Sequence, residues 1–191
     1  MSEPLTPEEK QTLLRLARQA LELGVRGEKL PPLDWDSLSP TLRADGASFV
    51  TLTVRGDLRG CVGALEAYQS LAADVREHAI AAALEDYRFR PVQVAELNGI
   101  SIEVSRLTAP VPLEYSSPED LIKKLRPGVD GVILRDGSRR ATFLPQVWEE
   151  LRDFRSFFAH LGMKAGLGSD PLVLHPDVYL YQVEKYTEHE E

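Results

Sequence analysis

The sequence contains only one cysteine, Cys61, among its 191 residues. A lone cysteine excludes an internal disulfide, and it excludes any zinc or iron–sulfur site built from several cysteines of this chain. The sequence also lacks an apolar run long enough to cross a membrane, and residues 1–10 lack the basic start and apolar stretch of a secretory signal. We therefore expect a cytoplasmic protein with no membrane-bound part.

Basic residues are scarce as well, because 22 Lys and Arg face 30 Asp and Glu, for a formal net charge of −8. Such a surface repels nucleic-acid phosphates, so nucleic-acid binding is disfavoured. The stretch Gly60–Gly63 lacks the lysine and the following helix of a phosphate loop, which argues against nucleotide hydrolysis. No close ligand spacing joins the histidines, so no metal site is predicted.

The composition, with 43% hydrophobic and 27% charged residues, is that of an ordinary globular protein. Short alternating strands are mixed irregularly with helices and joined by two hairpins, which predicts the α+β class. We expect an antiparallel or mixed β-sheet flanked by helices, in a single domain over residues 1–191. Helices are predicted from Thr6 to Gly24 or Gly27, over 70–85, 117–125 and 145–151, and from Phe154 to near Gly166 or Gly168. Strands are predicted over 48–54, 58–63, 99–105, 132–134, 141–144 and 178–186, the last pairing with the main sheet.

The stretch Leu58–Gly63 reads Leu-Arg-Gly-Cys-Val-Gly and is expected to be the returning strand of the first hairpin. The preceding strand, Ser48–Val54, runs into Gly56-Asp57, a dipeptide that favours a tight turn. A loop of these two residues places Cys61 opposite Leu52, on the apolar face of the hairpin.

Two interpretations of Cys61 follow from this hairpin. In the functional one, the Arg59 cation stabilises a reactive thiolate, while Gly60 and Gly63 let an anion or another backbone come close. In the structural one, Cys61 is a small buried hydrophobe, as free cysteines often are. The expected register favours the buried interpretation.

His78 lies on the predicted helix over residues 70–85, at the flank of its apolar stripe. If that helix packs across the hairpin, His78 can act as the general base for Cys61. The alternative is a hydrogen-bonded histidine at the edge of the core.

Two further charged residues have alternative roles. Arg88 lies on an irregular segment that Pro91 ends, where it either holds an anion or forms a salt bridge to Glu85 or Asp86. Glu103 lies on the polar face of the strand over residues 99–105. There it is either solvated or a candidate general base.

Several ordered segments resemble the AMMECR domain family. The segment Arg59–Gly63, which follows the predicted strand containing Phe49–Leu52, resembles the signature of this family. Further resemblances lie in Asp86–Val92, Gly131–Leu134, Thr142–Val147 and Lys164–Leu167. Two positions depart from the family pattern. Val62 replaces the usual isoleucine, and Tyr87 replaces a proline, which alters the turn before Arg88.

The resemblance implies a compact α+β fold in two lobes, with the signature near a cleft between them. Prokaryotic members that resemble this chain are called protein A of the AmmeMemoRadiSam system, alongside a Memo-like protein and a radical S-adenosylmethionine enzyme. The family pattern supplies no settled reaction, substrate or cofactor.

Two functions remain open. The first is a thiol-dependent enzyme or catalytic accessory, with Cys61 and His78 as catalytic residues. Arg59, Gly60, Gly63 and Arg88 would then bind a small anionic substrate. The second is a non-catalytic binding or adaptor module for a Memo-like or radical S-adenosylmethionine partner, in which Cys61 is structural.

Overall fold

The computed structural model describes residues 4–188. Its contacts divide the chain into two compact units. Of the described residues, the first unit contains 4–107 together with 184–188, and the second contains Thr108–Val183. Both combine helices with an antiparallel sheet, which confirms the predicted α+β class. The single domain and the cleft between lobes stay predictions.

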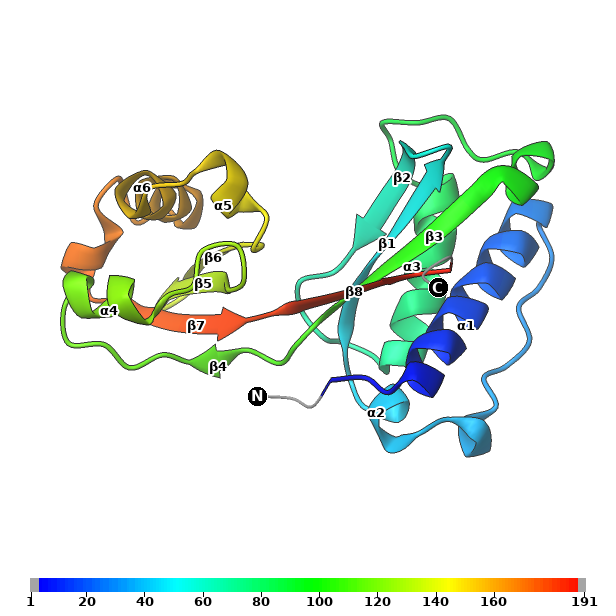
Figure 1. The fold of residues 1–191 in the computed structure, drawn as a ribbon, viewed down its shortest axis with the longest axis horizontal. Coiled ribbons are helices and arrows are strands. Elements are labelled where there is room, and N and C mark those ends of the chain that lie inside the picture. Colours follow the sequence, from blue (N-terminus) through cyan, green and yellow to red (C-terminus); the bar gives the residue numbers. More distant parts are fainter. Residues whose placement is uncertain (1–3, 189–191) are drawn as a thin grey trace. The chain divides into compact units, whose positions relative to one another are not determined.

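The first unit consists of a four-stranded sheet and two long helices (Figure 1). The strand order is β2-β1-β3-β8, with β1 at Ala47–Val54, β2 at Asp57–Gly63, β3 at Ile100–Leu107 and β8 at Val183–Thr187. Helices α1 (Pro7–Arg26) and α3 (Leu71–Leu84) pack on one face of this sheet and share its core. Three short helices complete the unit: η1 (Trp35–Ser37), α2 (Pro40–Arg43) and η2 (Val94–Gly99).

The ends of α1 follow from local chemistry. The Thr6 side chain accepts a hydrogen bond from the Glu9 backbone, and the Glu9 side chain accepts one from the Thr6 backbone, which forms a capping box. Gly27 ends the helix in the left-handed conformation, with φ 70°. Both predicted ends are confirmed. No helix among residues 4–188 has both the length and the apolar character needed to cross a bilayer.

The first hairpin turns one residue earlier than predicted. Its loop is Arg55-Gly56, with φ of 54° and 89°, and Val54 pairs with Asp57. Two successive positive φ values are typical of a tight turn whose twist matches the strands. The register then shifts between Leu52 and Thr53, where Arg59 is the extra residue of a β-bulge.

This register contradicts the prediction that Cys61 lies opposite Leu52. Cys61 pairs with Thr51, and Leu52 pairs with Gly60. Leu52 is fully buried, whereas Cys61 is only partly buried. The turn was misplaced because a glycine was expected at its first position, where the chain has Arg55 instead.

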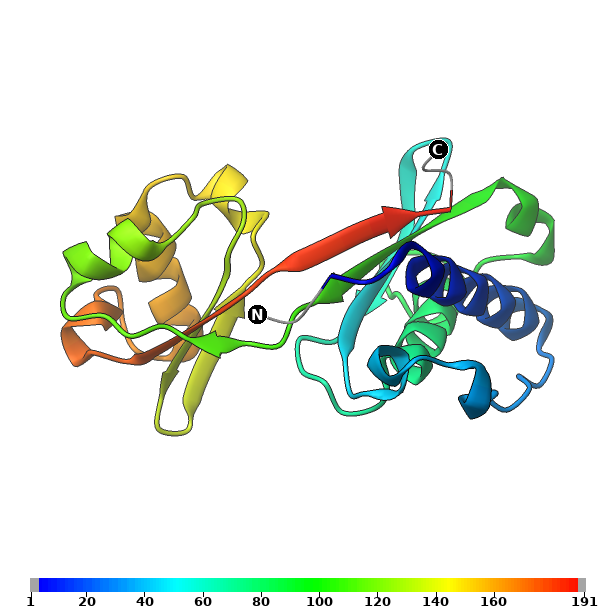
Figure 2. The ribbon, with the colours of Figure 1, turned by 60° about the horizontal axis from the view of Figure 1, so that its bottom comes forward.

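The second unit contains another four-stranded sheet, in the order β4-β7-β5-β6 (Figure 2). Its strands are β4 (Val111–Pro112), β5 (Gly131–Asp136), β6 (Arg139–Phe143) and β7 (Asp177–Tyr181). Its helices are α4 (Pro118–Lys124), α5 (Val147–Glu150), α6 (Phe154–Ala165) and η3 (Pro171–Leu174). Aromatic side chains of α5 and α6 form part of the core, where the Trp148 and Phe157 rings stack with centroids 3.6 Å apart.

The strand predicted over residues 178–186 is two strands in different sheets. β7 lies in the sheet of the second unit, whereas β8 pairs with β3, so only the second half joins the predicted sheet. Gln182 separates the two strands. Its backbone N–H donates to the Thr108 hydroxyl at 2.8 Å, and its carbonyl accepts from the Thr108 N–H at 2.9 Å.

Candidate functional site

The glycines of the Leu58–Gly63 motif are packing positions. A Cβ on Gly60 would lie 2.0 Å from the carbonyl oxygen of Ala82 in α3, so only glycine lets this helix approach the strand. A Cβ on Gly63 would lie 2.4 Å from the Phe49 ring and from the Ser48 carbonyl. The close neighbours of both glycines are therefore parts of the chain itself.

Cys61 follows Gly60 and so points to the other face of the sheet, away from α3. The Thr51 hydroxyl donates a hydrogen bond to its sulfur at 3.3 Å. Thr51 in turn lies opposite Glu103, whose carboxylate is 4.0 Å from the ammonium of Lys185. Since directly opposite residues share a face, a polar row of Cys61, Thr51, Glu103 and Lys185 crosses this face.

The backbone of Cys61 is held by two side chains from the loop after α3. Its N–H donates to Asp86 Oδ2 at 2.9 Å, and its carbonyl accepts from Arg88 Nη2 at 3.3 Å. Arg88 also donates to both oxygens of Asp86, at 2.9 and 2.6 Å. β2 is an edge strand, so Asp86 and Arg88 occupy backbone groups that a further strand would otherwise bind.

Asp86 is buried, with 7% of its surface exposed, and remains charged because of these partners. The hydrogen bonds from the Arg88 guanidinium, joined by the N–H groups of Cys61 and Arg88, hold the pKa of Asp86 well below its usual range. They outweigh burial, which acts in the opposite direction. Arg88 therefore forms the salt bridge that was one of its two predicted roles.

Arg59 is also paired with a carboxylate. Its Nε and Nη2 donate to the two oxygens of Glu96 at 2.8 and 3.1 Å, a bidentate arrangement. The Arg59 guanidinium is the main cause that lowers the pKa of Glu96 below its ordinary value. The two predicted anion holders, Arg59 and Arg88, thus each bind a carboxylate of the chain.

The structure does not bring His78 and Cys61 together. His78 is buried, and its Nδ1 lies 3.2 Å from Asp74 Oδ2, which also accepts the Ser48 hydroxyl at 2.6 Å. These residues lie between α3 and the helix-covered face of the sheet. Cys61 points from the opposite face, so His78 matches the interpretation of a hydrogen-bonded core residue.

Tyr87 was noted in the sequence only as a departure from a family pattern, yet it is 95% exposed. It is the second residue of a turn in which the Phe89 N–H donates to the Asp86 carbonyl at 3.0 Å. Proline is favoured at that position of a turn, so the site accepts either residue. The flanking Asp86 and Arg88 fix this turn against Cys61.

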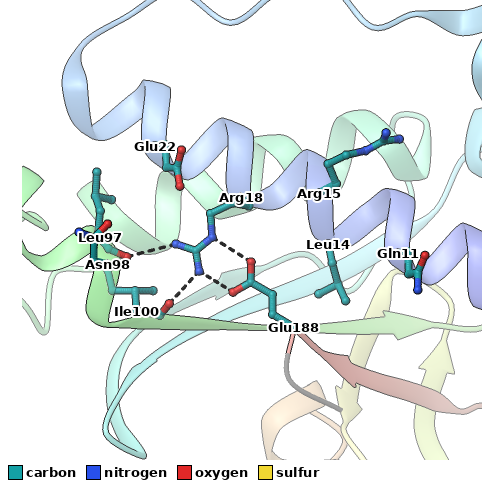
Figure 3. A pocket seen from close by; sticks show the side chains of 9 residues that line it. All are labelled: Gln11, Leu14, Arg15, Arg18, Glu22, Leu97, Asn98, Ile100 and Glu188. Atoms are coloured by element: carbon teal, nitrogen blue, oxygen red, sulfur yellow. Dashed lines mark hydrogen bonds and ion pairs between the residues drawn. The ribbon is translucent and has the colours of Figure 1, made fainter. Parts of the chain in front are cut away.

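Hollows lie elsewhere in the described part of the first unit, and two of them are large enough for a small molecule. The first, about 520 Å³, is lined along α1 by Gln11, Leu14, Arg15, Arg18 and Glu22, and opposite by Leu97, Asn98, Ile100 and Glu188 (Figure 3). Arg18 donates to the Glu188 carboxylate and to the carbonyls of Leu97 and Ile100, so its guanidinium ties α1 to the sheet. The second, here the hairpin hollow, measures about 490 Å³ and is lined by Val54, Arg55, Asp57, Leu58, Arg59, Ala95, Glu96 and Gly99.

No three His, Cys, Asp or Glu side chains converge within residues 4–188 in a way that could hold a metal ion. The functional groups around Cys61 are thus its own thiol, the Thr51 hydroxyl and the polar row on the sheet face. The exposed ring of Tyr87 belongs to the turn that binds the Cys61 backbone.

The AMMECR1 family model matches residues 14–186. A protein of Methanothermobacter thermautotrophicus is 41% identical over 189 residues, which cover 98% of this chain and 97% of that protein. Protein MK0488 of Methanopyrus kandleri is 38% identical over 204 residues, covering 100% of this chain and 93% of that protein. The crystal structure of the uncharacterized protein PH0010 from Pyrococcus horikoshii is similar in fold, with a TM-score of 0.77 and 33% identity over 97% of this chain and 94% of that one.

Proposed function

The chain belongs to the AMMECR1 family, and from this premise we propose that it is a docking module. Its docking edge consists of Cys61, Asp86, Tyr87 and Arg88. The partner we propose is a Memo-like or radical S-adenosylmethionine protein, with this chain as the cytoplasmic protein A component of an AmmeMemoRadiSam system.

One observation supports the proposal most: an exposed tyrosine lies in a turn whose two flanking residues are hydrogen-bonded to the sheet. Tyr87 is 95% exposed, while Asp86 and Arg88 bind the backbone of Cys61. Tyrosine and arginine are the residue types that most often dominate binding at protein interfaces. A turn fixed in advance loses little conformational entropy when a partner binds.

The charged groups support docking more than catalysis. Arg59 and Arg88 each bind a carboxylate of the chain, so the charge of each guanidinium is already compensated without a substrate anion. His78 lies on the other face of the sheet from Cys61. Glu103 is two strands away from the thiol and pairs with Lys185.

A thiol-dependent enzyme or catalytic accessory is the second candidate, because Cys61 is only partly buried and its sulfur accepts a hydrogen bond from the Thr51 hydroxyl. In that case a partner that docks at this edge would supply the base. Cys61→Ser separates the candidates: it leaves docking intact in both, and it abolishes turnover by the assembled proteins only if the thiol reacts.

The docking proposal is tested with Tyr87→Pro, because proline suits the turn and removes the aromatic ring. We expect affinity for the purified Memo-like or radical S-adenosylmethionine protein to fall about thirtyfold, equivalent to a 2 kcal/mol hot spot, with no loss of thermal stability. The matched control is Val173→Ala, which trims a 76% exposed apolar side chain of the second unit and leaves affinity unchanged. Equal affinity in Tyr87→Pro and the natural chain would refute the docking edge.

A further inference from the structure

Arg55 has an unfavourable backbone conformation at the tip of the first hairpin. Its φ of 54° lies in the left-handed region, and Gly56 follows with φ 89°. Turns of this kind favour asparagine before glycine, since a longer side chain is strained there. Backbone strain of this kind is found preferentially at ligand sites, which suggests that the Arg55 side chain contacts a ligand.

The charge of Arg55 is not neutralised by the chain. The side chain is exposed, and no ion pair or hydrogen bond joins it to another residue in the described part of the chain, 4–188. Arg59 lines the same hollow but forms its bidentate pair with Glu96. Arg55 is thus the guanidinium of the hairpin hollow that remains available to an anion.

The hairpin hollow also offers apolar surface next to this cation. Its volume of about 490 Å³ falls within the range of small-molecule sites. Val54, Ala95 and Leu58 contribute apolar side chains, and Leu58 is 44% exposed. Gly99 leaves space, since a Cβ there would meet no atom within 4 Å.

Two carboxylates in the lining limit the charge of a ligand. Glu96 is held by Arg59 and also accepts the Gln93 N–H at 2.7 Å, so its charge is compensated. Asp57 is exposed and opposes an incoming anion. A ligand with one negative charge suits this balance better than a phosphate ester with two.

We propose that the hairpin hollow binds a small monocarboxylic acid with an apolar body. The carboxylate pairs with the Arg55 guanidinium, and the apolar body covers Val54 and Leu58. This inference does not depend on the docking edge, which uses other residues.

The test is a titration of the isotope-labelled full chain with hexanoate, followed by amide NMR, with hexanamide as the uncharged control. We expect saturable shifts at Gly56, Leu58 and Gly99 with hexanoate and none with hexanamide. Arg55→Asn should weaken hexanoate binding about tenfold or more, the loss of one charge-assisted bidentate contact. The same variant should melt at a higher temperature, because asparagine suits the turn, so lost binding cannot come from unfolding.

Two further variants test whether charge controls hexanoate binding. Asp57→Asn should tighten hexanoate binding by removing a like charge, and Arg55→Lys should retain part of it. Equal affinity in Arg55→Asn and the natural chain, or equal shifts with hexanamide, would overturn the proposal. So would hexanoate shifts confined to the α1 hollow of Figure 3.

Discussion

The carboxylate of Asp86 lies 2.9 Å from the backbone nitrogen of Cys61, 25 residues earlier in the chain. A loop residue thereby completes the hydrogen bonding of an edge strand. The same carboxylate accepts a hydrogen bond from Arg88, and Arg88 also donates one to the Cys61 carbonyl. Stability and the presentation of Tyr87 therefore depend on one buried charge.

Asp86→Ala should destabilise the protein by about 3 kcal/mol, since it leaves the Cys61 N–H and the Arg88 guanidinium without their acceptor. Urea denaturation measures the loss. Glu85→Ala, the exposed neighbour, is the control and should change stability by less than about 0.5 kcal/mol. A similar effect of both variants would show that the Asp86 contacts contribute little.

Acid should remove the contribution of the Asp86 carboxylate to the free energy of unfolding. Its pKa in the folded protein lies below the unfolded value of about 3.9, so the ionised carboxylate stabilises the fold above that pH. This stabilisation is lost as the pH falls from about 3.9 towards the folded-state pKa. The stability difference between the natural chain and Asp86→Asn should narrow over that acid range. A difference that stays constant from neutral pH into this range would contradict the assignment.

Cys61 should react with iodoacetamide in the folded protein. The residue is only partly buried, so we expect that modification needs no global unfolding and that low urea concentrations leave the rate unchanged. Mass spectrometry measures the rate, and Cys61→Ser provides a blank because the chain has no other cysteine. If the thiol is protected until the protein unfolds, Cys61 is a packing residue after all.

Gly60→Ala should be severely destabilising, by about 3 kcal/mol, because its methyl group would collide with the Ala82 carbonyl of α3. Gly99→Ala is the matched control. A Cβ there meets nothing within 4 Å, so we expect a change within about 1 kcal/mol. Thermal denaturation of both variants measures the contrast, and equal melting temperatures would mean that α3 shifts to accommodate the methyl group.

Local chemistry made parts of the fold predictable. Thr6, Glu9 and Gly27 are adjacent to the helix they cap, so α1 could be placed from neighbouring residues. The strict alternation after Gly99 likewise identified β3. The turn of the first hairpin could not be placed, because Arg55 adopts a conformation that its residue type disfavours.

The candidate site was less predictable because its contacts join distant segments. Sequence reasoning selected Cys61, Arg59 and Arg88, and it named Asp86 among the possible partners of Arg88, but it did not find the carboxylate that pairs with Arg59. Glu96 is 37 residues from Arg59, and no local pattern links them. The face of the sheet on which Cys61 lies, and so its separation from His78, depended on a register that the bulge at Arg59 changed.

The placement of β7 and β8 has a consequence for biosynthesis. A ribosome makes residues 177–187 after the other strands of both sheets, yet β7 is an inner strand of one sheet and β8 an outer strand of the other. A nascent chain that stops before Asp177 lacks a strand in both sheets, and its unpaired strand edges remain open to other chains. Neither unit can be completed during translation until this short segment has left the ribosomal tunnel. We therefore expect chaperones that bind during synthesis to protect these open edges.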